Sequence, residues 1–467
     1  MNPQLATFVF GLGILFLFVL YRDPKAYTSK ALWIPTIWIL LAGSRMVSQW
    51  LNPTAEIQNP QQYIDGSPLD RFILTMLLMA GVMVLVARWH RVGRVLRMNA
   101  PVLLFFTYCA ISALWSDYTD VSLKRWVKAV GDLVMVLVVL TDRDRVTAIK
   151  RLFARVGFLL MPVSVLLIEY YPNMGRAYMP EIGEVANVGV TTNKNTLGMV
   201  CMVLGLGFVW LLIKALREKR HQISHVVAVG STLVIILWLL VTAHSATSLA
   251  SFMLGSVLIV FLNLPGKVRP SRVHFIIGVM VFTAALAFLF PDIYSSVVHA
   301  LGKNTTLTGR TQLWNVLLGM NHSPWFGTGY SSFWLGNRLQ TLWTIFPWQP
   351  NEAHNGYLEI LLDLGWAGIV LLGSLILTGY RNGIAMFSRD PEAGSLRLAF
   401  IVVAVVYNFT ESGFRMLNPT WIFFILAILA LPEASVSKTV TVEAQKPARI
   451  PVRELAAVGS HFKEGTL

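Results

Sequence analysis

The residues best suited to chemistry lie between Thr306 and Gly368, where Arg, His, Gly, Asn and Trp crowd a stretch between apolar segments. His354 stands directly before a long apolar run, where an imidazole can accept a hydroxyl proton near neutral pH, as a general base must. No carboxylate orients it in helical register, because Leu358 lies one turn further on. Glu352 or Glu411 can approach His354 only through the fold. The alternative interpretation is a histidine that merely caps the helix.

Three carboxylates are further candidates. Glu359 and Asp363 are four residues apart and share one face of the expected helix that follows His354. Ionisable groups early in a membrane helix are costly and often functional. Glu411, within the sequence NFTESG, has a similar setting. The alternative is that these acids lie near the membrane surface, where water still reaches them.

Cations from separate connections form a second group of candidates. Their members are Arg125, Lys194, Arg310 and Arg415. Guanidinium groups pair with phosphate oxygens in two-pronged fashion, so these cations together suit a diphosphate held at the membrane interface. In TTNKNTLG (191–198), Asn193 and its neighbours can cap a helix whose N-terminus also favours an anion. Taken singly, each cation is equally explained by snorkelling to the membrane surface.

The composition indicates the elements that must position these groups. The chain has 467 residues, of which 55% are hydrophobic and only 13% charged. Its mean hydropathy is +0.60. A soluble protein carries roughly a quarter charged residues, whereas apolar runs of about 20 residues are long enough to cross a bilayer. We therefore predict an all-α polytopic integral membrane protein.

The net charge of +14 admits two interpretations, nucleic-acid binding or cytoplasmic loops rich in Lys and Arg. The membrane composition favours the second, so no nucleic-acid partner is expected. Cys109 and Cys201 both fall inside apolar runs, which argues against a disulfide and against a cysteine metal site. No metal and no cofactor are predicted.

The apolar runs predict about 12–13 membrane spans. They cover residues 5–21, 31–49, 72–88, 101–116, 126–140, 156–171, 195–213, 226–243, 246–264, 275–291, 355–378, 398–409 and 419–432. The first run lacks the leader and cleavage site of a signal peptide, so we expect it to stay as a helix. Alternate connections are strongly basic, and by the positive-inside rule they face the cytoplasm. The stretch before His354 then faces outward, with the N-terminus outside and the C-terminus inside.

Four regions follow from this pattern. Residues 1–290 form an N-terminal transmembrane bundle, 291–354 a large periplasmic catalytic loop, 355–432 the C-terminal transmembrane helices, and 433–467 a cytoplasmic tail. The tail lacks helical and strand periodicity.

Six sequence segments resemble one known family. They are SLKRW (122–126), NKNTLG (193–198), GRTQLW (309–314), PWFGTGYSSF (324–333), HNGYLEILLDLGWAG (354–368) and TESGFRMLNPTWIFF (410–424). The match is densest over the third to fifth segments. The chain resembles the O-antigen ligase and polysaccharide polymerase superfamily, and looks closest to its exopolysaccharide-production branch.

This resemblance implies a metal-independent, inverting glycosyltransferase with a GT-C-like helical bundle in the bacterial inner membrane. Its donor would be a glycan linked to undecaprenyl diphosphate at the periplasmic face, and its acceptor a glycan or a lipid. His354 matches the family's essential histidine, which would deprotonate or position the acceptor hydroxyl. Arg310 matches the loop arginine that would bind the diphosphate. Asn355, beside His354, is a further candidate, and other polysaccharide assembly and export proteins are candidate partners.

One segment departs from the family pattern. Many ligases carry an arginine after a serine where this chain has HSATSL (244–249). Its absence favours polymerisation of repeat units over ligation to lipid A. Lys194, Arg125 or Arg415 are the candidates to replace it.

Two other functions compete with the glycosyltransferase. A transporter of a small anion or a lipid-linked sugar would place its ionisable groups near the bilayer midplane on broken helices. Here the densest cluster is expected in an outward loop and at the adjoining helix ends, which favours chemistry at the surface. A scaffold in a secretion complex would need neither His354 nor Arg310.

Overall fold

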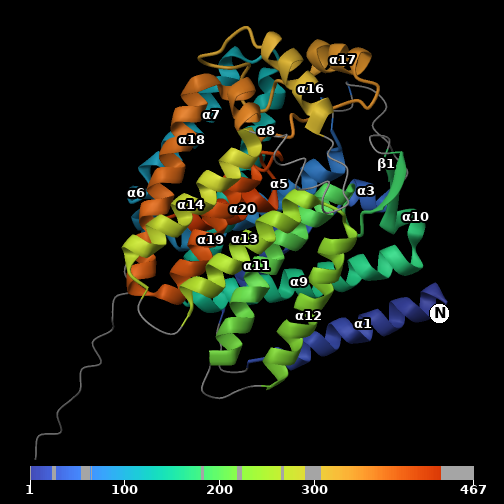
Figure 1. Ribbon diagram of the computed structural model, residues 1–467, viewed down its shortest axis with the longest axis vertical. Coiled ribbons are helices and arrows are strands. Elements are labelled where there is room, and N and C mark those ends of the chain that lie inside the picture. Colours follow the sequence, from blue (N-terminus) through green and yellow to red (C-terminus); the bar gives the residue numbers. More distant parts are fainter. Residues whose placement is uncertain are drawn as a thin grey trace, which may run out of the picture. The chain divides into compact units, whose positions relative to one another are not determined.

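The computed structural model describes residues 2–432, except for 24–27, 54–60, 62–63, 65, 180–182, 218–222, 265–267 and 290–306. The predicted tail (433–467) and the first part of the predicted loop lie outside the described residues. What is described is almost entirely helical (Figure 1). A single hairpin supplies the β structure of these residues: β1 (Arg176–Met179) pairs antiparallel with β2 (Glu184–Asn187), Arg176 opposite Asn187.

The helices follow one another along the chain with short connections. They are α1 (Pro3–Leu20), η1 (Lys30–Leu32), α2 (Trp33–Ala42), α3 (Val47–Leu51), α5 (Pro68–Ala87), α6 (Trp89–Arg97), α7 (Ala100–Ser112), η2 (Ala113–Trp115), α8 (Thr119–Leu140), α9 (Arg145–Tyr170), α10 (Pro172–Gly175), α11 (Lys194–Arg217), α12 (Ile223–Thr242), α13 (Ala246–Leu262), α14 (Pro270–Leu289), α16 (Leu307–Gly319), α17 (Gly336–Ile345), α18 (Gly356–Arg389), α19 (Pro391–Tyr407) and α20 (Pro419–Ile428).

The predicted all-α polytopic class is confirmed, but the span count differs. Each of the thirteen predicted spans coincides with a helix, yet only seven described helices are long and apolar enough to cross a membrane: α1, α5, α9, α11, α12, α14 and α18. The bent pair of α6 and α7–η2 makes an eighth candidate. The helices α2, α13, α19 and α20 are shorter, and α8 carries charges along its first half.

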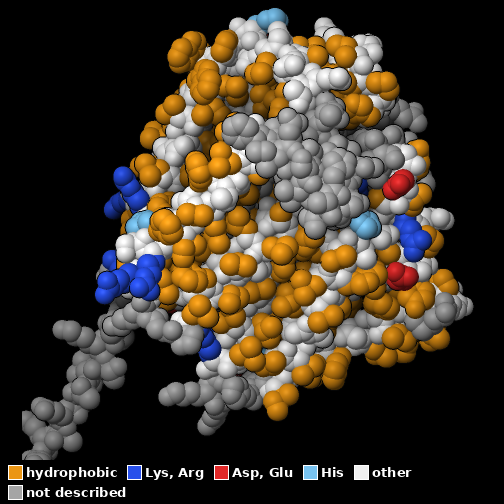
Figure 2. Space-filling view, viewed as in Figure 1, with side chains coloured by type: hydrophobic (Ala, Val, Ile, Leu, Met, Phe, Trp, Pro, Cys, Tyr) orange, Lys and Arg blue, Asp and Glu red, His pale blue; other side chains and the backbone are white. Residues whose placement is uncertain are grey.

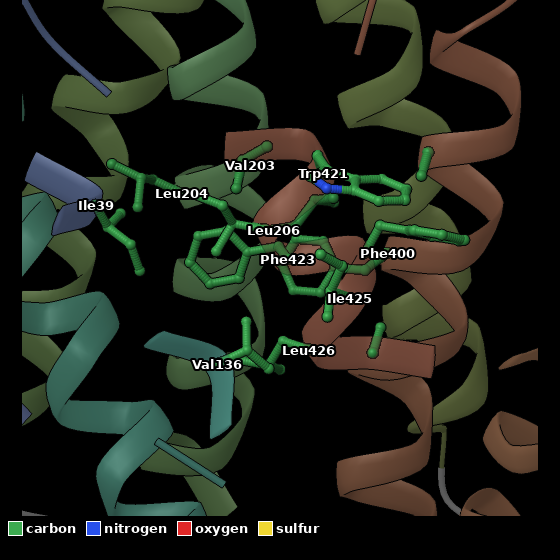
Figure 3. Packing of buried hydrophobic residues seen from close by; sticks show 14 of the residues in the cluster. Ile39, Val136, Val203, Leu204, Leu206, Phe400, Trp421, Phe423, Ile425 and Leu426 are labelled. Atoms are coloured by element: carbon green, nitrogen blue, oxygen red, sulfur yellow. The ribbon is translucent and has the colours of Figure 1, made fainter. Parts of the chain in front are cut away.

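The core centres on α20, all ten residues of which are buried. A helix that is apolar on every side belongs inside a bundle. It packs against α8, α11, α18 and α19, and Phe423 stacks on Phe400 and Phe153 at centroid distances of 5.3 and 4.9 Å (Figure 3). Outside this core the visible surface is dominated by hydrophobic side chains, with Lys and Arg gathered mostly at one edge (Figure 2). That distribution suits a protein whose flanks face lipid.

The long helix α18 is kinked at Gly365, and the kink attaches the segment between α16 and α17. Gly365 has φ of 65°, and a Cβ there would lie 2.3–2.4 Å from backbone atoms of Trp325 and Phe326. Only glycine allows both this backbone conformation and this close approach. Trp366 and Ala367 then donate backbone hydrogen bonds to Pro324 and Trp325. The segment after α16 is thereby fixed against α18, one helix turn or more beyond the residues that begin it.

Candidate functional site

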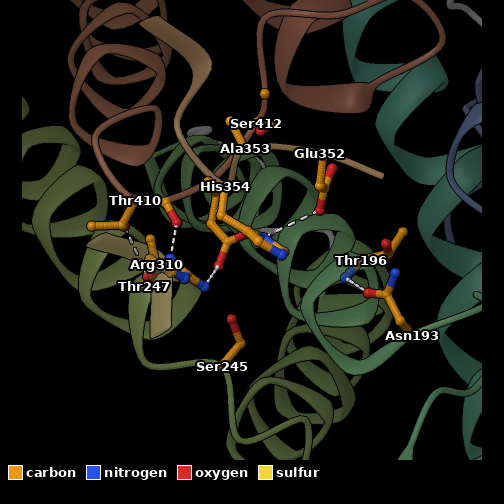
Figure 4. Close-up of polar contacts among 12 residues, drawn as sticks. Asn193, Thr196, Ser245, Thr247, Arg310, Glu352, Ala353, His354, Thr410 and Ser412 are labelled. Carbon is orange, nitrogen blue, oxygen red and sulfur yellow. Dashed lines mark hydrogen bonds and ion pairs between the residues drawn. The ribbon is translucent and has the colours of Figure 1, made fainter. Parts of the chain in front are cut away.

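The candidate site is built around the carboxylate of Glu411, in the connection between α19 and α20. Arg310, on α16, donates from Nη2 to one oxygen of Glu411 at 3.3 Å. His354, which directly precedes α18, places Nδ1 3.4 Å from the other oxygen. Arg310 also donates from Nη1 to the carbonyl of Thr410 (Figure 4). One buried acid thus joins the imidazole and the guanidinium that the sequence singled out.

A second ion pair adjoins the first. Glu352 lies 3.3 Å from Nδ1 of His354, and its other oxygen lies 2.6 Å from Nη1 of Arg415. Two carboxylates therefore face one ring nitrogen, and each is also paired with an arginine. We call Arg310, Glu352, His354, Glu411 and Arg415 the polar cluster.

The backbone around His354 is held in an unusual conformation. Its φ is 50°, a left-handed value that is costly for any residue except glycine. The next residue, Asn355, caps α18 by accepting hydrogen bonds from the amides of Tyr357 and Leu358, both at 3.0 Å. The amide of Gly356 donates to the carbonyls of Asn408 and Glu411. The capped helix start and the α19–α20 connection together aim the imidazole at Glu411.

Glu359 supports the cluster from below rather than joining its ion pairs. Its carboxylate is buried and accepts hydrogen bonds from Nε1 of Trp334 at 2.7 Å, from Oγ of Ser412 at 3.3 Å and from the amide of Ala353. These three donors come from the α16–α17 connection, the α19–α20 connection and the residue before His354. Glu359 therefore ties together the three segments that carry the cluster.

Asp363 and Arg125 belong to the anchoring of the loop. Asp363 accepts from the amides of Ser332 and Phe333 at 3.1 and 3.0 Å. Arg125, on α8, donates from Nη1 to the carbonyl of Ser331 at 2.5 Å. The described contacts of both residues thus hold the segment that follows α16, so a role of Arg125 in binding a diphosphate remains a prediction.

The start of α11 lies on the Glu352 side of the cluster (Figure 4). Asn193 caps this helix as expected, because its Oδ1 accepts from the amide of Thr196 at 2.7 Å. Lys194 is the first residue of α11 and is half-buried. A diphosphate role for Lys194 also stays a prediction.

Electrostatics favour a charged imidazole. Burial alone would lower the pKa of His354, but Glu352 and the hydrogen-bonded Glu411 outweigh it and raise the pKa above its ordinary value. Burial would raise the pKa of Glu352, yet Arg415, His354 and Arg310 together lower it. Glu352 in turn raises the pKa of Arg415. A base between two carboxylates holds a proton on Nδ1, which leaves Nε2 as the atom that can accept a second one.

The same residues were tested as metal ligands. One ligand atom each from Glu352, His354 and Glu411 lies within 4.8 Å of the others, close enough to ligate one ion. Arg415 and Arg310, however, already pair with the two carboxylates. The negative charge that a divalent cation needs is therefore balanced by arginines, and the residues present fit a metal poorly.

Sequence reasoning placed Arg310, His354, Asn355, Glu359 and Glu411 at or beside one site, and the structure brings all five together. It undervalued Glu352, because the search for a partner relied on helical register, and the positive φ of His354 puts that residue outside the helix. It also treated the aromatic residues of the loop as a group. Trp348 stands out among them, since its ring lies 6.4 Å from that of His354 with an interplanar angle of 31°.

Fold and site define an all-α, multi-pass membrane protein that carries a buried acid–base cluster at the end of its longest helix. Residues 231–373 match the family model described as O-antigen ligase. The chain is also 27% identical over 304 residues to "Exopolysaccharide production protein ExoQ" of Rhizobium meliloti (strain 1021), covering 62% of this chain and 67% of that protein. The two matches confirm the resemblance predicted from the sequence and place the chain in the O-antigen ligase and ExoQ-like superfamily.

The matched region contains Arg310, Glu352, His354, Glu359 and Asp363. Glu411 and Arg415 lie beyond it. The family match and the geometry are thus independent observations, since the carboxylate that joins Arg310 to His354 comes from outside the matched segment.

Proposed function

We propose that this protein is an inverting glycosyltransferase that takes a glycan from an undecaprenyl-diphosphate carrier and transfers it to a glycan or lipid acceptor. The observation that carries the proposal is the shared carboxylate of Glu411, which holds a base and a diphosphate-binding cation at one place. The family match supports a ligase- or polymerase-type membrane enzyme.

In the proposed step, Nε2 of His354 takes the proton of the acceptor hydroxyl. The hydroxyl oxygen then attacks the anomeric carbon of the donor sugar from the face opposite the carrier, forming the new glycosidic bond with inversion. The bond from that carbon to the diphosphate oxygen breaks, and the diphosphate leaves with the electron pair. A diphosphate is a good leaving group, so alignment and electrostatic stabilisation are the main requirements of the protein.

Arg310 and Arg415 are the proposed diphosphate ligands. A guanidinium has five N–H donors, and the described contacts of Arg310 with Glu411 and Thr410 use two of them. Arg415 is about half exposed and lies on the Glu352 side of His354. The two arginines flank the imidazole from opposite sides. That placement supports Arg415, more than Lys194 or Arg125, as the substitute for the arginine that many ligases carry in HSATSL (244–249).

The HSATSL segment itself reaches the cluster. It leads into α13, and Thr247 Oγ1 lies 3.0 Å from Oγ1 of Thr410, whose carbonyl accepts from Arg310. An arginine here would lie close to Arg310, and this chain has none. We therefore favour polymerisation of repeat units over ligation, with the active site on the periplasmic face of the inner membrane, opposite the basic connections.

The test uses purified full-length protein in nanodiscs with an undecaprenyl-diphosphate oligosaccharide. We expect a ladder of products for a polymerase, a single joined adduct for a ligase, and loss of product in His354→Ala and Arg310→Ala. Arg338→Ala is the matched control, because it removes a loop arginine whose ion pair with Asp117 lies away from the cluster. Full transfer by His354→Ala would contradict the proposal.

A transporter of a small anion or lipid-linked sugar is the second candidate. It would need ionisable groups near the middle of the spans, whereas the polar cluster is gathered where α18 begins and α19 ends. Uptake or flipping of the lipid-linked sugar without any new glycosidic bond would favour it.

A further inference from the structure

A basic cavity lies far along the chain from the polar cluster. Its volume is about 400 Å³. The residues that line it are Ser29, Ala87, Arg88, His90, Arg91 and Arg143. They come from the segment before η1, from the junction of α5 and α6, and from the α8–α9 connection, which are among the connections that the positive-inside rule assigns to the cytoplasm.

The cavity lies beside an amphipathic helix. In α6, Arg91, Arg94 and Arg97 are exposed while Val95 is buried, and the axis turns by 91° into α7. Trp89 is 65% exposed and its ring lies 3.6 Å from that of His90. A short basic helix with an exposed tryptophan at a sharp bend is typical of the membrane interface.

The arginines of the cavity are held in place by the protein. Arg88 donates to the carbonyl of Val138 at 3.0 Å and Arg91 to that of Thr141 at 3.1 Å. Arg88 also pairs with the buried Asp142 at 3.7 Å. Side chains fixed in this way lose little conformational entropy when they bind an anion.

Positive charge is in excess around the cavity. Three guanidinium groups and one imidazole surround it, against the single carboxylate of Asp142. Burial lowers the pKa of Arg88, and the neighbouring Arg91 and Arg143 lower it further although Asp142 opposes them. A bound anion would relieve this repulsion.

An apolar flank leads from the cavity along α5. Met79, Val82, Met83 and Val86 are 43–66% exposed. A ligand with a negative head and an apolar tail matches this combination of basic cavity and apolar flank. We propose that the cavity binds the phosphate of an anionic phospholipid from the adjoining leaflet, whose acyl chains lie along α5.

The experiment measures lipid adducts of the purified full-length protein by native mass spectrometry. Phosphatidylglycerol is titrated against phosphatidylcholine, which has the same tails but no net charge. We expect preferential binding of phosphatidylglycerol, and a loss of about 25-fold in the double variant Arg91→Gln/Arg143→Gln, at about fivefold for each arginine. Equal binding of the two lipids by the unmodified protein would overturn the proposal.

The matched control is Arg94→Gln/Arg97→Gln, which removes the same charge from α6 without touching the cavity lining. If both double variants weaken binding equally, diffuse attraction to the basic surface explains the result and the cavity is not the site. Glycerol 1-phosphate distinguishes a lipid from a soluble phosphate. We expect it to bind at least tenfold more weakly than phosphatidylglycerol, and equal affinity would overturn the assignment to a lipid. Unchanged thermal unfolding of both variants without lipid shows that each is folded.

Discussion

Replacing Glu411 by Gln tests whether one carboxylate organises the proposed chemistry. The substitution keeps the size of the side chain but removes its charge. It therefore weakens two contacts at once, the one to Nη2 of Arg310 at 3.3 Å and the one to Nδ1 of His354 at 3.4 Å. Glu411 is 5% exposed, so water cannot replace either contact.

The size of the effect follows from these contacts. A hydrogen bond to a charged group contributes about 1.5–3 kcal/mol, which corresponds to roughly 10- to 150-fold in a rate if the interaction is made in the transition state. We expect kcat/KM to fall within this range. Glu411 is also one of the groups that raise the pKa of His354. Transfer requires the unprotonated imidazole, so activity rises as pH increases through that pKa, and removing the charge moves this rise to lower pH.

The assay is initial-rate transfer of glycan from the undecaprenyl-diphosphate donor between pH 5 and 9. Glu392→Gln is the matched control, since it removes one carboxylate from an ion pair with Lys214 away from the cluster. We expect the control to keep both the rate and the pH profile. If Glu411→Gln kept the wild-type profile, or lost rate without moving its rising limb, the coupling of Glu411 to His354 would be wrong.

Three further predictions follow from the same contacts. Gly365→Ala should lower the stability by about 1–3 kcal/mol because of its positive φ, seen as a fall in Tm, whereas Gly373→Ala, with open space around it, should not; equal Tm values would contradict this account of the kink. Because the pKa of His354 is raised in the folded state, its contribution to stability is complete below the unfolded pKa of about 6.5 and is lost as pH rises through the folded value; His354→Gln should flatten this part of the stability–pH curve, and an unchanged slope would refute the raised pKa. Transfer should survive EDTA, since arginines balance the carboxylates of Glu352 and Glu411, and a loss of activity that a divalent cation restores would show that a metal binds there.

Much of the fold could be predicted because membrane helices announce themselves locally. An apolar run of sufficient length is visible in the sequence, and each expected span coincides with a helix. The number that crosses the membrane was harder to predict. The ten-residue helix α20 reads as a short span, but its apolar character reflects burial on every side by other helices. Hydropathy does not distinguish lipid from a protein core.

The candidate site was predictable in its parts but not in its connections. His354 and Arg310 were identified by residue type and by resemblance, both of which are local. Their common partner was not, because Glu411 lies 57 positions from one and 101 from the other. The helical-register search failed for a physical reason: His354 has a left-handed backbone conformation outside the helix, so its carboxylates come from Glu352 and from the α19–α20 connection.

The sharing of Glu411 has a consequence for the proposed reaction. Before transfer, its charge is divided between Arg310 and the imidazole of His354. When Nε2 accepts the proton of the acceptor, the ring becomes a full cation and attracts Glu411 more strongly. The hold of Glu411 on Arg310 weakens at the same moment as negative charge develops on the departing diphosphate. Because one carboxylate serves both groups, proton transfer at the base makes the guanidinium more available to the leaving group, and the two ends of the reaction are coupled without a metal ion.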